Sequence, residues 1–103
     1  MKNKRMQNVL RKNMLLQIGL DLAKHHGYTN ISKYKIADKA DVSPSLVAKV
    51  LGTAVNMRRD IMIYAIKNQC LSVMAQGMVL RDPKILKLDD DTKTLMFNFI
   101  KEQ

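Results

Sequence analysis

Apolar residues recur along the first part of the chain at the three- and four-residue intervals of an α-helix. These intervals predict a helix over residues 9–25 that ends before Gly27. No alternating polar and apolar run favours a strand, and the stretch IMIYAI at 61–66 keeps the helical period of its neighbours. The pattern therefore predicts an all-α fold. The apolar positions of the first helix are Leu10, Met14, Leu15, Ile18 and Leu22.

Capping residues divide the rest of the chain into further helices. Ser32 and Ser43 are typical N-caps, and Pro44 after the second suits a first helical position. Asn56 is expected to open a longer helix that Gly77 closes. Acidic residues are favourable at a helix start, so two later acidic segments are interpreted as helix starts. The expected helices cover 33–40, 43–51, 57–75, a segment from Asp82-Pro83, and a last segment from 89–91 to Ile100.

In the two short helices on either side of the turn Asp41-Val42-Ser43, the apolar residues follow the same spacing. Their apolar residues fall where a helix-turn-helix faces its own core, and the small Ala37 stands where the two helices cross. Asp41 occupies the turn position that is most often glycine, so a left-handed backbone is expected there. The segment therefore predicts a helix-turn-helix core. Its core-facing positions are Ile36, Ala40, Val42, Val47 and Val50.

The outward positions of the second short helix are small, polar or basic. Such a surface fits a DNA major groove about 12 Å wide. Ser43, Ser45 and Lys49 are the expected groove contacts, with Pro44 and Ala48 beside them. Phosphate contacts are expected from Lys33, Tyr34 and Lys35 at the start of the preceding helix, and from Lys2, Lys4 and Arg5 near the N-terminus.

Positive charge is concentrated in the first two thirds of the chain. Residues 1–67 hold 13 Lys and Arg against 4 Asp and Glu, whereas residues 68–103 hold 5 of each. This segregation favours a polyanionic partner, and nucleic acid more than a membrane surface. The 103 residues are expected to form one domain. Within it we distinguish a basic N-terminal arm or frayed helix start (1–12), a helix-turn-helix core (13–55) and C-terminal helices (56–103).

The segment KIADKADVSPSLVAKVLG resembles the helix-turn-helix of bacterial and phage transcriptional repressors. A long helix, Gly-Tyr, a short helix, a turn and a recognition helix follow one another as in the N-terminal DNA-binding domain of the tetracycline-repressor family. The ending VSPSLVAKVLG is similar to the recognition helix of the lactose-repressor family, where a base-contacting arginine stands at the position of Lys49. The resemblance covers about residues 14–66 and implies a DNA-binding three-helix core.

Motif and charge together predict a sequence-specific DNA-binding regulator, most simply a small repressor that acts by occupying a promoter. The alternative is a protein-interaction module that binds RNA polymerase or another host protein without reading DNA. Paired half-sites are usual for helix-turn-helix proteins, so a homodimer is expected. Its interface is expected in the C-terminal helices. The apolar candidates there are Leu71, Met74, Leu95, Phe97, Phe99 and Ile100.

Other chemistry is weakly represented in the sequence. His25 and His26 lack further ligands at metal-binding spacing, and the acidic run 89–91 lacks the glycine of a calcium loop. No phosphate-binding loop or paired nucleophile and base is recognisable, so no enzyme activity, cofactor or small-molecule ligand is indicated. No run reaches the length of a membrane span, and the single cysteine, Cys70, fits a reducing cytoplasm.

Overall fold

The computed structural model describes residues 4–103, with side chains from residue 8 onward. This part of the chain forms seven α-helices and one short 3-10 helix, and it contains no strand, which confirms the all-α prediction. The elements are α1 (Lys4–His26), η1 (Tyr28–Asn30), α2 (Lys33–Ala40), α3 (Pro44–Leu51), α4 (Ala54–Lys67), α5 (Leu71–Val79), α6 (Pro83–Leu86) and α7 (Asp90–Lys101).

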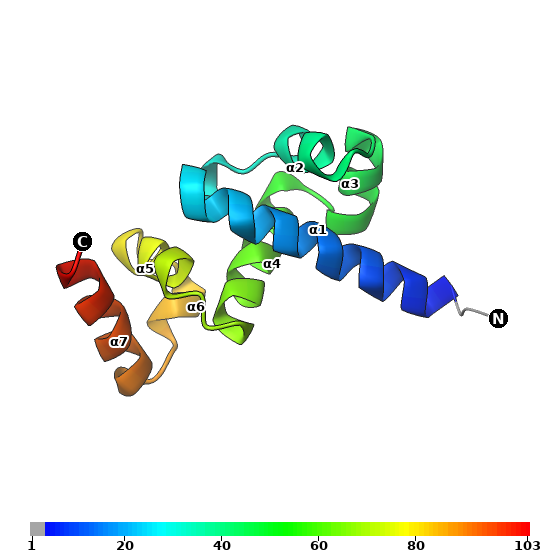
Figure 1. Ribbon diagram of the computed structural model, residues 1–103. Helices are drawn as coiled ribbons and strands as arrows, with labels where there is room; N and C mark the ends of the chain where they lie inside the picture. The colour runs from blue at the N-terminus through cyan, green and yellow to red at the C-terminus, as the bar shows by residue number, and fades with distance from the viewer. Residues whose placement is uncertain (1–3) are drawn as a thin grey trace.

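The long helix α1 packs against most of the other helices. Helices α2 and α3 pack against one side of α1, and α4 crosses beneath it and leads to α5, α6 and α7 at the end opposite the N-terminus (Figure 1). Helices α1, α2 and α4 meet at Gly19, where an added Cβ would lie 2.8 Å from Ile61 Cδ1 and 3.4 Å from Ile36 Cδ1. A glycine at this point allows the close approach, because it has no side chain to separate the helices.

The two short helices lie close to their predicted bounds. The Ser32 hydroxyl oxygen accepts a hydrogen bond from the Lys35 backbone N–H at 3.3 Å, and Ser43 accepts one from the Leu46 backbone N–H at 3.2 Å. Asp41 has φ 58° and ψ 47°, the left-handed conformation expected from its place in the turn. Of the core-facing positions, Ile36, Ala37 and Val47 are buried, and Ala40, Val42 and Val50 pack half-buried against the same core.

Of the two alternatives for residues 1–12, an arm or a helix start, the described residues 4–12 form a helix start. Helix α1 begins at Lys4 and continues through them to His26. Leu10 and Met14 are exposed, since this half of α1 projects beyond the core (Figure 1). Lys2 and the side chains of Lys4 and Arg5 lie outside the described residues. Gly27, with φ 86°, ends α1 as predicted.

The single helix predicted over 57–75 is wrong, because two helices occupy this region. Thr53 rather than Asn56 caps α4, accepting the Asn56 N–H at 3.2 Å. Helix α4 ends at Lys67, and Gln69 takes a left-handed conformation with φ 51° before α5 begins. Gly77 lies inside α5 rather than after it. The Asp82-Pro83 start and the Asp89 cap of α7 follow the prediction.

Candidate nucleic-acid interface

Helix α3 presents one buried and one exposed face. Val47 is fully buried on the first, while Ser45 and Lys49, one turn apart, are exposed on the second. Pro44 and Ala48 are half-buried between the two faces. The exposed face therefore carries a hydroxyl and an ammonium group.

Ser43 has a structural role in addition to its predicted one. Its oxygen accepts the N–H of Leu46 as the N-cap of α3. A hydroxyl has one hydrogen and two lone pairs, so Ser43 keeps a donor for an acceptor outside the protein. The residue is exposed, which leaves that donor accessible.

The three residues at the start of α2 differ in their surroundings. Tyr34 is 63% exposed, and the Lys33 Nζ lies 5.3 Å from the centre of its ring, within the range of a cation–π contact. The Lys35 Nζ donates a hydrogen bond to the Asn30 backbone carbonyl at 3.1 Å. Lys33 and Tyr34 thus form one paired group, whereas the Lys35 ammonium turns toward η1.

A hollow of about 530 Å³ joins the start of α2 to α3 and α4. Lys33 and Tyr34 reach it from α2, Ala48 from α3, and Arg58 from α4. The structure therefore brings three of the predicted residues to one surface, while Lys35, Ser43, Pro44, Ser45 and Lys49 do not line the hollow. Its lining consists of Ser32, Lys33, Tyr34, Ala48, Gly52, Thr53, Ala54, Met57 and Arg58.

Arg58 is the residue that sequence reasoning missed. It is half-buried, and its Nε is buried without a hydrogen-bond partner. The signal for it was the basic pair Arg58-Arg59 in the second turn of α4. Burial of the Arg58 Nε depends on how α4 packs, which the sequence alone does not show.

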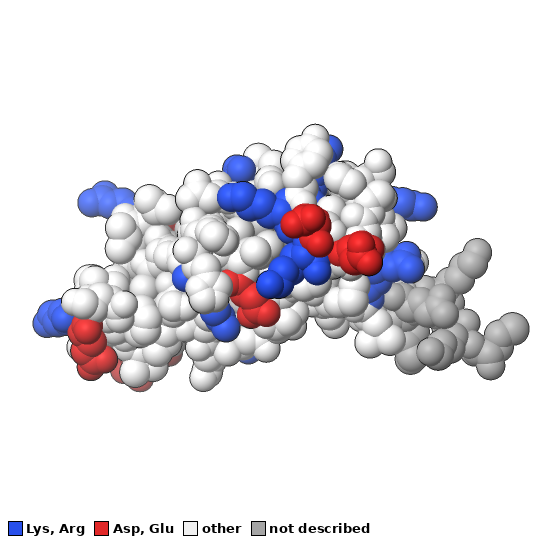
Figure 2. Space-filling model, turned by 45° about the horizontal axis from the view of Figure 1, so that its top comes forward, with Lys and Arg blue, Asp and Glu red and all other residues white. Residues whose placement is uncertain are grey.

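Charge on this side of the molecule is mixed. Figure 2 shows Lys and Arg side chains spread over the face that carries α2 and α3, with acidic side chains between them. Asp38 and Asp41 are both exposed in this segment. They offset part of the charge of the neighbouring lysines. The segregation of charge along the sequence therefore does not produce one uninterrupted basic patch on this face.

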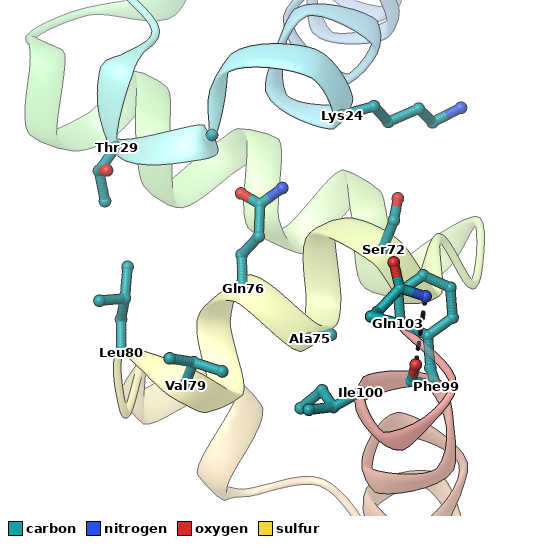
Figure 3. A pocket seen from close by; sticks show the side chains of 11 residues that line it. Lys24, Thr29, Ser72, Ala75, Gln76, Val79, Leu80, Phe99, Ile100 and Gln103 are labelled. Carbon is teal, nitrogen blue, oxygen red and sulfur yellow. Dashed lines mark hydrogen bonds between the residues drawn. The ribbon is translucent and has the colours of Figure 1, made fainter.

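A second hollow, of about 550 Å³, lies at the other end of the molecule and is mostly apolar. Figure 3 shows Val79 at the end of α5, Leu80 directly after it, and Phe99 and Ile100 of α7 around the hollow. Gln76 forms part of its wall and is directed toward the end of α1.

The candidate dimer residues are distributed unevenly between core and surface. Met74 is 1% exposed and belongs to the core, so its predicted place in an interface is wrong. Leu71, Phe99 and Ile100 are half-buried, whereas Leu95 and Phe97 are each 55% exposed. The exposed pair flanks the buried side of α7.

Comparison of the chain with models of known protein families, with curated proteins and with solved structures found no match. The resemblance to repressors thus rests on the motif in the sequence. In the described part of the chain, no helix combines the length and hydrophobicity needed to cross a bilayer.

Proposed function

We propose that this protein is a sequence-specific DNA-binding regulator whose helix α3 enters the major groove. The observation that carries the proposal is the exposed face of α3, where the Ser45 hydroxyl and the Lys49 ammonium lie one turn apart, next to a hollow that Lys33 and Arg58 line. A groove-binding helix needs both, because bases are recognised by short polar contacts and phosphates by charge. Occupancy of a promoter by such a protein would repress transcription.

The residues divide into two roles under this proposal. Lys49 and Ser45 face the bases from the exposed side of α3, and the exposed Ser43 joins them from the N-cap of this helix. Lys33 and Tyr34 contact phosphates across the hollow from Ala48. Lys35, with Lys2, Lys4 and Arg5, supplies further backbone contacts, and α1 would bring the last two to the DNA as part of a helix rather than an arm.

The experiment compares Lys49→Ala with Lys67→Ala. Both lysines are exposed and both changes remove one charge, but Lys67 ends α4 far from α3 along that helix. Selection from a random DNA pool first supplies the preferred duplex. Lys49→Ala should then reduce the difference in binding free energy between the preferred and the scrambled duplex by about 1–3 kcal/mol. Lys67→Ala should leave this difference, and so the ratio of the two affinities, unchanged. An unchanged ratio for a folded Lys49→Ala protein would show that α3 does not read the bases.

We further propose that the regulator acts as a homodimer through its C-terminal helices. Leu95 and Phe97 support this, because they are large, apolar and exposed on either side of the α7 face that packs on α5. Leu95→Glu should give a monomer by sedimentation while keeping the helical content. A wild-type monomer at high protein concentration would refute the dimer.

The same exposed residues favour the second candidate function, a protein-interaction module. The two functions differ in one measurement. A protein-interaction module would select no preferred duplex from the random pool, and its binding to a host protein such as RNA polymerase would depend on Phe97 and not on Lys49.

A further inference from the structure

A third hollow, of about 340 Å³, separates the first turns of α4 from α6. Arg58 and Arg59 reach it from α4, and Lys84 reaches it from α6. Three cationic side chains from segments far apart in the sequence thus share one small space. Its lining consists of Tyr28, Val55, Arg58, Arg59, Asp82, Pro83 and Lys84.

The one carboxylate in this hollow is already engaged within the protein. Asp82 Oδ1 accepts the backbone N–H of Lys84 at 2.9 Å, and Oδ2 accepts the hydroxyl of Tyr28 at 3.3 Å. Outside the hollow, the exposed Arg59 lies near the half-buried Asp60, with Nε 3.7 Å from Oδ1, and Asp60 also pairs with Lys12. Positive charge therefore remains in excess in the hollow.

Arg58 connects this hollow with the one beside α3, because it lines both. Its Nε lacks a hydrogen-bond partner, and a buried donor without a partner destabilises the structure that contains it. An anionic oxygen that drew the guanidinium toward it would relieve this cost. The planar guanidinium also matches the paired oxygens of a phosphate group.

We infer that Arg58, Arg59 and Lys84 form a binding site for a phosphodiester group of the DNA backbone, next to the surface of α3. The inference rests on the proposed function and extends the DNA contact from the motif to α6, in the C-terminal part of the chain. Such a contact carries no base information, so it adds affinity for any duplex.

The test compares Lys84→Gln with Lys87→Gln. Lys87 follows α6 directly and is exposed, but it does not line the hollow. Lys84→Gln should weaken binding to preferred and scrambled duplexes by the same factor, and reduce the slope of log affinity against log salt concentration by about one unit. Lys87→Gln should change neither. Arg58→Gln, if folded by circular dichroism, should behave like Lys84→Gln.

Equal losses of slope for Lys84→Gln and Lys87→Gln would overturn the site, because they would indicate only overall charge. Unchanged slopes for Lys84→Gln would overturn it too, and the proposed function would stand if Lys49→Ala still lowered the preference for the selected duplex.

Failure of the proposed function has a different signature, the absence of duplex binding by the wild type. Titration with inorganic phosphate then tests whether the site exists, with NMR followed at the backbone amides of residues 55–59 and of Asp82 and Lys84. Shifts that Lys84→Gln abolishes would support a phosphate site that serves another source of phosphate. Their absence would overturn the site together with the function.

Discussion

Gln76 is predicted to hold the C-terminal helices to the end of α1. Its side chain points from α5 toward α1 and η1 (Figure 3). Oε1 accepts the backbone N–H of Tyr28 at 2.8 Å, and Nε2 donates to the backbone carbonyl of Ala23 at 3.0 Å. Both partners are main-chain groups near the end of a helix, where backbone groups lack hydrogen-bond partners within the helix.

The replacement Gln76→Met keeps the length of the side chain and removes both hydrogen bonds. A partly buried group left without a partner costs about 1–3 kcal/mol. The Ala23 carbonyl keeps its bond from the Gly27 N–H at 2.9 Å, so the larger loss is expected at the amide of Tyr28. The free energy of unfolding should fall by about 2 kcal/mol, which corresponds to a decrease in Tm of roughly 10 °C in a domain of this size.

Urea denaturation followed by circular dichroism measures this loss, and hydrogen exchange reports the amide of Tyr28 separately. Gln17→Met is the matched control. Gln17 also accepts a hydrogen bond between two helices that are far apart in the sequence, α1 and α4. The donor is the Tyr64 hydroxyl, at 3.1 Å, and the bond lies on the exposed surface. Its replacement should cost at most about 0.5 kcal/mol, as is usual for surface substitutions. If Gln76→Met cost no more than the control, the two hydrogen bonds would not stabilise the junction.

Three further changes test other parts of the fold. Asp41→Gly should raise the free energy of unfolding in urea by about 0.5–1 kcal/mol, because φ is 58°; a loss would contradict the strain. Gly77→Ala should lower Tm, costing about 1–3 kcal/mol, since the new Cβ would lie 2.7 Å from Ile85 Cγ1; an unchanged Tm would refute this packing. Burial, and then the charge of Asp82, raise the pKa of Tyr28 above 10.0. The folded state therefore holds this proton more tightly, and the resulting stability is complete below pH 10 and lost as pH rises through the raised pKa. Urea titrations between about pH 8 and 11 should show this loss in the wild type and not in Tyr28→Phe.

The starts of α2, α3 and α6 were predictable because N-cap chemistry is local. Ser32, Ser43 and Asp82 each accept a hydrogen bond from a backbone N–H at most three residues further along the chain. Both partners of such a bond are therefore visible in a short stretch of sequence. The break between α4 and α5 has no such signal. It depends on a left-handed Gln69, a residue type that rarely marks a helix end.

Gly77 shows the opposite failure, a local signal overridden by tertiary contact. Glycine usually marks the end of a helix, but here it continues α5. An added Cβ would lie 2.8 Å from Met62 Cε on α4 and still closer to Ile85 on α6. The glycine is needed for packing between three helices, and the sequence alone does not show which helices meet.

The candidate phosphate site was hidden for a related reason. Charge summed along residues 68–103 is zero, which led us to assign no polyanion contact to that part of the chain. In space its charges separate. Asp89 caps the start of α7, where a hydrogen bond from Thr92 lowers the pKa of its carboxyl group, and Asp90 and Asp91 follow in the first turn. Lys84 lies instead beside the arginines of α4. A segment that is neutral in sequence thus contributes a cation to the hollow between α4 and α6.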